Sequence, residues 1–357
     1  MIFQTEQIVM NQLHQWLTRC VDSQASDLHL SSGLPPQMRL HGEIQRMSEV
    51  VLTGEAIQAM LHSVMSEAVR TQFAIDLEAD FSFEVPQLGR FRANAFHQMR
   101  GVAAVIRLIP SHIPSLSDIQ APAVVTALLA QSSGLILVTG PTGSGKSTTL
   151  AAMVDHINRH IGGHILTVED PVEFVHASQR GLVNQREVGV HTYSFANALR
   201  SALREDPDVL LVGELRDLDT IRLALTAAET GHLVLATVHT SSAAKTVDRL
   251  VDVFPGDEKN MARAMLSESL LAVISQTLCP RQDGLGRVAA HEVMVATPAI
   301  RNLIREAKVA QMYSVIQTGQ SLGMQTLDQH LQVLLQQGHI SLTVAQSYAR
   351  SPEMLRA

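Results

Sequence analysis

One short glycine-rich segment limits the possible folds of this chain more than any other feature. Residues 134–150 read Gly-Leu-Ile-Leu-Val-Thr-Gly-Pro-Thr-Gly-Ser-Gly-Lys-Ser-Thr-Thr-Leu. An apolar run at residues 135–138 precedes the glycines, and a helical stretch at residues 150–157 follows them. The spacing G-x-x-x-x-G-K-S between a strand and a helix is that of a phosphate-binding P-loop.

The residue types of this segment suit an anion. Glycines let the backbone curl so that successive N–H groups face one point, and the start of the following helix adds further donors and a positive dipole end. Lys146 supplies a full charge for the β and γ phosphates, and Ser147 supplies a hydroxyl ligand for Mg²⁺. The expected nucleotide-binding residues are Gly140, Pro141, Thr142, Gly143, Ser144, Gly145, Lys146, Ser147 and Thr148.

The composition excludes several other classes of protein. The chain has 357 residues, a formal net charge of −7 and two cysteines, Cys20 and Cys279. An acidic chain lacks the clustered Lys and Arg that bulk nucleic-acid binding needs. Two cysteines argue against a disulfide framework or a Cys-rich zinc module and indicate a reducing compartment. We find neither a signal peptide nor a run of about 18 uncharged apolar residues, so we expect a cytoplasmic protein without a spanning segment.

The first part of the chain, residues 1–112, predicts a small α+β domain with an antiparallel sheet. Apolar residues at helical spacing predict a helix over residues 8–21. The alternating or apolar segments that predict strands are residues 28–30, 38–40, 81–85, 91–96 and 102–109, with a tight turn at 41–42 after the second. Two prolines within residues 110–115 indicate a linker.

The second part, residues 113–357, predicts an α/β domain. Its continuous apolar runs alternate with helical stretches, as expected for strands that are buried on both faces of a parallel sheet. The runs are residues 135–138, 165–168, 209–212 and 233–237. The last third of the chain is expected to be mostly helical, for example at residues 259–274 and 298–308.

Acidic residues follow two of these predicted strands. Glu214 comes after the run 209–212, with Gly213 at the place where an Asp is usual, and it could position Mg²⁺ or water. Glu169, Asp170 and Glu173 follow the run 165–168 and could hold a metal or polarise water. The alternatives are a surface Glu after an ordinary strand and a solvated acidic turn.

His232 and His239 bracket another predicted strand, residues 233–238. Near a P-loop, two such histidines could sense the γ-phosphate or relay its state to another subunit. The alternative is a purely structural role for both.

Taken in order, these segments resemble those of the secretion ATPase superfamily, the hexameric motors of type II secretion and type IV pili. Residues 140–148 match its Walker A motif. Its Asp box, atypical Walker B motif and His box match residues 167–173, 212–214 and 230–239. The segment 299–306, Ala-Ile-Arg-Asn-Leu-Ile-Arg-Glu, resembles the C-terminal signature of the PilT-type pilus retraction ATPases, although Leu215 stands where that subfamily often has Met.

The resemblance implies a PAS-like N-terminal domain followed by a RecA-like P-loop ATPase domain with a helical C-terminal region. It implies a homohexameric ATP hydrolase in which Ser147 and Glu214 hold Mg²⁺, and Glu214 or Glu169 is the general base. Arg92 and Arg107 match the positions from which related motors present arginines to a nucleotide. The C-terminal signature helix is implied to be needed for retraction and not for hydrolysis itself.

The same resemblance implies a partner and a place of action. The load would be the pilus platform protein of the inner membrane, so the motor would dock on the cytoplasmic face of that membrane through its partner, with no nucleic acid involved. The alternatives are a related secretion or pilus-extension motor, and a nucleotide-regulated scaffold with little turnover. The four-Cys zinc loop typical of the extension relatives is absent from this sequence, which disfavours the extension alternative.

Overall fold

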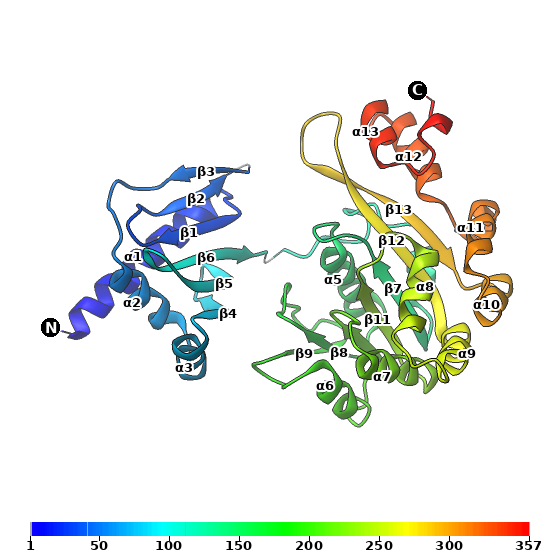
Figure 1. The fold of residues 1–357 in the computed structure, drawn as a ribbon, viewed down its shortest axis with the longest axis horizontal. Helices are drawn as coiled ribbons and strands as arrows, with labels where there is room; N and C mark the ends of the chain where they lie inside the picture. Colours follow the sequence, from blue (N-terminus) through cyan, green and yellow to red (C-terminus); the bar gives the residue numbers. More distant parts are fainter. Residues whose placement is uncertain (1, 41, 111, 357) are drawn as a thin grey trace. The chain divides into compact units, whose positions relative to one another are not determined.

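The computed structural model describes residues 2–40, 42–110 and 112–356, with side chains from Asn11 onward. The chain divides into two compact units, Met1–His112 and Ile113–Ala357, which Figure 1 shows in blue to cyan and in green to red. His41 of the predicted turn, Ser111 of the predicted linker, and the side chains of Ile8 and Val9 in the first predicted helix lie outside the described residues.

The first unit is an antiparallel sheet with helices on one face. Its strands follow the order β3-β2-β1-β6-β5-β4. They are β1 (Asp27–Ser31), β2 (Gln37–Leu40), β3 (Glu43–Arg46), β4 (Glu78–Val85), β5 (Gly89–Gln98) and β6 (Gly101–Ile109), and the helices are α1 (Ile2–Asp22), α2 (Gly54–Val64) and α3 (Glu67–Asp76). The side-chain oxygens of Thr53 and Ser66 cap α2 and α3, as Thr and Ser do at helix starts.

Strand alternation builds the core of the first unit. Every second residue points to the same face, and on one face these residues are apolar, for example Leu28, Phe91 and Ile106, each about 1% exposed. Leu13 and Leu17 of α1 belong to the same buried cluster. The other face carries charged side chains, among them Asp27, Arg92 and Arg107.

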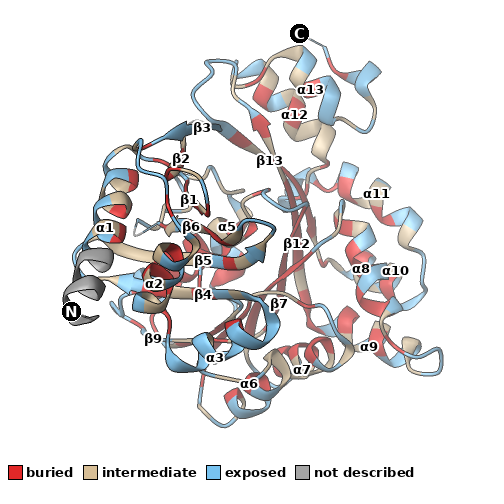
Figure 2. Ribbon diagram, turned by 60° about the vertical axis from the view of Figure 1, so that its left-hand side comes forward, coloured by how far each residue is buried: buried red, intermediate tan, exposed pale blue. Residues whose placement is uncertain are grey.

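The second unit is built on a seven-stranded sheet of order β13-β12-β7-β11-β10-β8-β9. Only the β12–β13 pair is antiparallel. The strands are β7 (Gly134–Thr139), β8 (His164–Glu169), β9 (Leu182–Glu187), β10 (Val209–Val212), β11 (Leu233–Val238), β12 (Leu270–Pro280) and β13 (Arg287–Val295). Figure 2 shows the central strands as buried, and every residue of β7, β10 and β11 is buried.

Helices cover both faces of this sheet. Alternate strand residues divide between two clusters: Ile136 and Val138 pack with α4 (Val124–Leu129) and α5 (Lys146–His156), while Leu135 and Leu137 pack with the helices of the opposite face. Those helices are α6 (Phe195–Ala202), α7 (Leu218–Glu229), α8 (Ala243–Asp252), α9 (Lys259–Ser269), α10 (Pro298–Arg305) and α11 (Val309–Thr318). Further helices, α12 (Leu327–Gln336) and α13 (Leu342–Tyr348), follow near the C-terminus.

Parallel pairing brings the residues that follow four strands to one edge of the sheet. Val138 lies beside Thr237 across the β7–β11 pair, and Val212 lies beside Ala236 and Val168 across its two neighbours. The carboxyl ends of β7, β8, β10 and β11 therefore meet, which is where ligands bind in open α/β sheets.

The prediction for residues 259–274 was wrong at its C-terminal end. Helix α9 ends at Ser269, and Leu270 begins β12, which pairs with β7 inside the sheet. A short apolar run is compatible with a buried helix and with a buried strand, and periodicity does not separate them. The last third contains more helix than strand, as predicted, but the two long strands β12 and β13 precede the helices that start at Pro298.

Candidate nucleotide site

The phosphate loop joins β7 to α5 in a conformation that requires glycine. Gly140, Gly143 and Gly145 have φ values of 144°, 77° and 87°, a region that other residues enter only at a cost. A Cβ atom on Gly140 would lie 2.2 Å from the backbone oxygen of Gln276. Gly145 ends the loop as the N-cap of α5, so the loop leads directly into the first turn of that helix.

Lys146 lies folded over this loop. Its Nζ donates to the backbone oxygens of Gly140 and Pro141, each at 3.0 Å, and its side chain is buried. Burial lowers its pKa, and the negative charges of Glu214 and Glu173 partly offset that effect. The ammonium group is therefore held at the mouth of the loop by weak neutral acceptors, which an anion can replace.

The other predicted nucleotide-binding residues lie in the phosphate loop and in the first turn of the helix that follows it. Pro141, Thr142, Gly143 and Ser144 form the loop itself, and Ser147 and Thr148 lie in the first turn of α5. The Ser144 hydroxyl is buried without a hydrogen-bond partner among the described atoms. Since a buried polar atom is normally paired, this loop has donor capacity to spare for a ligand.

Glu214 lies just beyond β10, at the edge of the sheet where the phosphate loop begins. Arg216 Nη2 lies 2.6 Å from its Oε2, and His239 Nε2 lies 3.5 Å from its Oε1. Burial alone would raise the pKa of Glu214, but Arg216, His239 and Lys146 together lower it below its ordinary value. Glu214 is therefore an ionised carboxylate at neutral pH.

Glu169 ends the neighbouring strand β8 and has the opposite environment. Thr167 Oγ1 and Gln185 Nε2 donate to its Oε1 at 2.6 and 3.2 Å, and the backbone N–H of Glu173 donates to its Oε2 at 3.4 Å. Burial raises its pKa in spite of these donors. Two carboxylates with opposite shifts at one edge of a sheet are typical of paired catalytic roles.

The two predicted histidines are separated by the whole length of β11. His239 lies at its carboxyl end, beside Glu214. His232 lies at the other end, where its Nδ1 is 3.0 Å from the backbone oxygen of Ala227 and its backbone oxygen accepts from Gly134, the first residue of β7. Within one chain, the structure brings His239 and not His232 to the phosphate loop.

Arg92 and Arg107 belong to the first unit and are direct cross-strand neighbours on β5 and β6. Arg92 pairs with Asp80, with its Nη2 2.5 Å from Oδ2, and Arg107 Nε lies 2.8 Å from Oδ1 of the buried Asp27. The two guanidinium groups therefore lie on the charged face of that sheet. Each has an acidic partner in its own unit.

Two features beside the phosphate loop were not predicted from the sequence. Gln276 of β12 donates from Nε2 to the backbone oxygen of Ser144 at 2.6 Å and accepts from Thr149 Oγ1 at 2.9 Å. A cavity of about 260 Å³ also borders the loop, lined in part by Asp118, Thr148, Arg281 and Arg287. The sequence signal for Gln276 was a polar amide within the apolar run of β12. The cavity joins segments too distant in the sequence for any local pattern.

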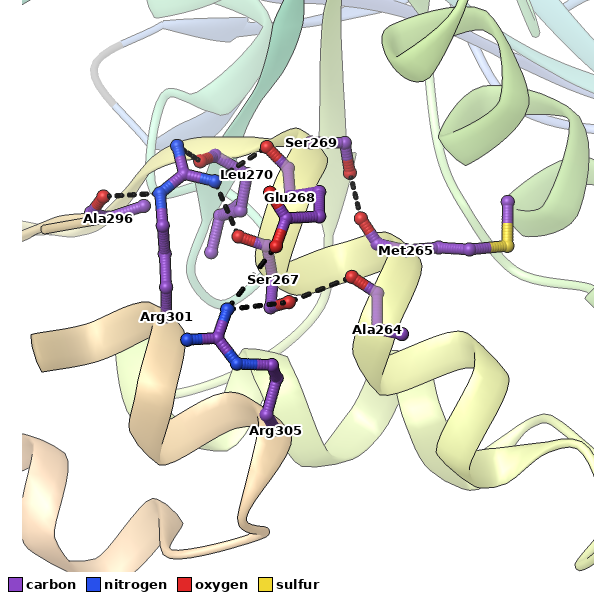
Figure 3. Close-up of polar contacts among 9 residues, drawn as sticks. All are labelled: Ala264, Met265, Ser267, Glu268, Ser269, Leu270, Ala296, Arg301 and Arg305. Carbon is purple, nitrogen blue, oxygen red and sulfur yellow. Dashed lines mark hydrogen bonds and ion pairs between the residues drawn. The ribbon is translucent and has the colours of Figure 1, made fainter. Parts of the chain in front are cut away.

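The helix of the C-terminal signature is α10, and Figure 3 shows how Arg301 attaches it to the end of α9. Arg301 donates to four backbone oxygens: those of Ala296 (3.0 Å), Ser267 (2.5 Å), Glu268 (2.5 Å) and Leu270 (3.1 Å). The oxygens of Ser267, Glu268 and Leu270 lie at the end of α9 and at the start of β12, so a single side chain joins α10 to both elements. Thr297 caps α10 and Pro298 occupies its first turn, as their residue types favour.

The site suits Mg²⁺ better than a metal held by protein side chains alone. Among the described residues, no group of three or more His, Cys, Asp or Glu side chains could hold a metal ion. Mg²⁺ is usually bound by one or two protein oxygens, together with substrate phosphates and waters. The hydroxyl of Ser147 and the ionised carboxylate of Glu214 are hard oxygen donors that fit this arrangement.

Comparison with known proteins identifies the group to which this architecture belongs. The sequence matches the family described as Type II/IV secretion system protein over residues 3–343. It is 60% identical over 329 residues to the Type IV pilus retractation ATPase PilT of Pseudomonas aeruginosa, covering 92% of this chain and 95% of that protein. It is 57% identical over 320 residues to a twitching motility protein of Neisseria gonorrhoeae, covering 90% and 86%.

A solved structure agrees with these sequence matches. A crystal structure of the pilus retraction motor PilT with bound ADP superposes with a TM-score of 0.89 at 47% identity, covering 96% of this chain and 98% of that one. The predicted fold class is thereby confirmed. The chain belongs to the family of Type II/IV secretion system proteins and is an ATP hydrolase similar to the PilT-type retraction ATPases.

Proposed function

We propose that this protein is a homohexameric, Mg²⁺-dependent ATPase motor that drives retraction of type IV pili. The observation that carries the proposal is the 60% identity with a pilus retraction ATPase over nearly the full length of both chains. A motor fits this site because its phosphate loop, its carboxylates and its signature helix belong to one continuous sheet and the helices packed on it.

Nucleotide binding begins at the phosphate loop. The backbone N–H groups of residues 140–148 and the N-terminus of α5 bind the phosphates, and Lys146 exchanges its two carbonyl contacts for phosphate oxygens. The cavity lined by Asp118, Arg281 and Arg287 has room for the nucleoside part. Ser147 and Glu214 would hold Mg²⁺, which would supply positive charge at the transferred phosphoryl group.

The hydrolytic step divides between the two carboxylates. Glu214, kept ionised by Arg216, His239 and Lys146, orients Mg²⁺ or the attacking water. Burial raises the pKa of Glu169, and a raised carboxyl pKa favours the role of a general base that accepts a proton from the attacking water. His239, 3.5 Å from Glu214, orients that carboxylate and would sense the γ-phosphate through it.

The proposed ring brings further side chains to each nucleotide site. Arg92 and Arg107 reach a nucleotide when the small domain of the same or of a neighbouring subunit closes, and each then exchanges its acidic partner for phosphate. An arginine of this kind can contribute about 10³–10⁵ in rate. His232, remote from the phosphate loop of its own chain, is assigned to relaying the nucleotide state to another subunit.

The load is the inner-membrane pilus platform protein, and the motor acts on it from the cytoplasmic side. No helix among the described residues is long and apolar enough to cross a bilayer. We therefore propose that docking on the platform protein places the motor at the membrane, with no part for nucleic acid.

A deletion strain tests the proposal. Loss of a retraction motor should leave cells with excess surface pili that do not shorten, and twitching motility should be absent. Cells that lose their pili instead would have lost an extension or assembly motor, which contradicts the proposal. Unchanged pili and motility would point to the scaffold alternative.

A further inference from the structure

Gln276 is a polar residue in the buried middle of β12, and its side chain points at the phosphate loop. It is 3% exposed, and its neighbours Ile274 and Ser275 pair with Val138 and Thr139 at the end of β7. β12 thus places this amide beside Gly140, where the loop begins. Burying an amide is unfavourable unless both of its ends are bonded, and here both are.

The two bonds of Gln276 hold separate parts of the loop. Nε2 donates to the Ser144 oxygen at 2.6 Å, and Oε1 accepts from Thr149 Oγ1 at 2.9 Å. Ser144 lies within the loop, whereas Thr149 lies in the first turn of α5, where its own N–H bonds to the Gly145 oxygen at 3.0 Å. One amide therefore fixes the loop relative to the helix that follows it.

The backbone of Gln276 restrains the loop from a third side. Its carbonyl oxygen would lie 2.2 Å from a Cβ atom on Gly140, so the loop and β12 are in close contact at that point. The sequence separations are 127 and 132 residues for the two side-chain bonds. The loop is thus positioned by a distant strand as well as by its own glycines.

We propose that Gln276 is a positioning residue of the nucleotide site, which keeps the phosphate loop in the form that binds ATP. An anion site built from backbone N–H groups works only while those groups converge. When a binding-competent form is only partly populated, the apparent affinity falls by that fraction. The proposal requires ATP binding at the loop but is independent of what the motor moves.

The test uses near-isosteric substitutions in the full-length protein. Gln276→Met keeps the length of the side chain and removes both hydrogen bonds, and Thr149→Val removes one of them. The matched control is Gln325→Met, because Gln325 also donates an amide hydrogen bond, to the His291 oxygen at 3.1 Å, but does not contact the loop. For each variant we would measure the Kd for ADP, the KM and kcat for ATP, and the melting temperature without nucleotide.

The expected result separates positioning from general stability. Gln276→Met should raise the Kd for ADP and the KM for ATP about tenfold, the size expected from two lost buried hydrogen bonds. The value of kcat should change less than KM, since no group that contacts the reacting atoms is removed. Thr149→Val should raise both constants about threefold, and the double variant should be no worse than Gln276→Met because the two residues share a bond.

Gln325→Met should lower the melting temperature without changing either constant. The proposal is overturned if Gln276→Met binds ADP within twofold of the wild type, or if Gln325→Met weakens binding equally. If Gln276→Met does not fold, Thr149→Val alone decides, and wild-type KM and Kd values in that variant refute the proposal. A wild-type protein that neither binds nor hydrolyses ATP would instead refute the function proposed above.

Discussion

Arg301 offers a sharp test of how the C-terminal part of the fold is held together. Arg301→Ala removes four hydrogen bonds to the oxygens of Ala296, Ser267, Glu268 and Leu270. A hydrogen bond that involves a charged group contributes about 1.5–3 kcal/mol, and bonds from one side chain are not additive. We expect the free energy of unfolding to decrease by about 3 kcal/mol, because the backbone oxygens of Ser267 and Glu268 at the end of α9 lose the donor that Arg301 supplies.

The assay is thermal and denaturant unfolding, with Arg305→Ala as the matched control. Arg305 lies one turn further along α10 and makes longer, more exposed contacts, 3.3 Å to Glu268 Oε1 and 3.5 Å to Ser267 Oγ. Its removal should cost at most about 1 kcal/mol, as for exposed pairs. For a unit of this size, 3 kcal/mol corresponds to a fall in Tm of about 6–12 °C. Equal losses for the two variants would refute the assignment of Arg301 as the tie between α10, α9 and β12.

Three further predictions address the loop, the buried histidines and the ring. Gly140→Ala should lower the rate of phosphate release at least tenfold, since the added methyl group would clash with the backbone oxygen of Gln276 and a positive φ costs an alanine about 1–2 kcal/mol. An unchanged rate would contradict this prediction. Burial lowers the pKa of His291 to about 3, so the folded state stays neutral while the unfolded chain binds a proton below about pH 6.5. The free energy of unfolding therefore decreases as the pH is lowered, and His291 should account for about 2 kcal/mol of the decrease between pH 7 and pH 5. In denaturant unfolding, His291→Gln should lose about 2 kcal/mol less than the wild type over this range, and an equal loss in both proteins would exclude the effect. If Arg107 acts on a neighbouring subunit, mixing Arg107→Ala with Lys146→Ala subunits should release more phosphate than the average of the two alone, whereas simple dilution would exclude action across an interface.

Local pattern was sufficient for the sheet and the phosphate loop. The run at residues 135–138, the glycine spacing and the following helix all occupy their predicted places, because the glycine spacing and its flanking strand and helix are local features of the sequence. Glu214 and Glu169 could be assigned to one edge for a similar reason. Parallel strands that each end in a carboxylate present those carboxylates together.

Long-range packing determines the features that the sequence did not reveal. Gln276 meets the loop only because β12 inserts next to β7, and the same insertion turned residues 270–274 from an expected helix into a strand. His232 and His239 look equivalent in the sequence, yet six strand residues separate them, and only one end of β11 faces the loop. The contacts of Arg301 depend on how α10 packs on α9, which no local pattern encodes.

Retraction of individual pili tests the central proposal most directly. In a deletion strain with fluorescently labelled pili, the wild-type gene should restore shortening. Lys146→Ala, in which the charge at the mouth of the phosphate loop is lost, should leave pili that extend and never shorten. Pili that shorten at the wild-type rate with Lys146→Ala as the sole copy would contradict the claim that ATP hydrolysis at this loop drives retraction.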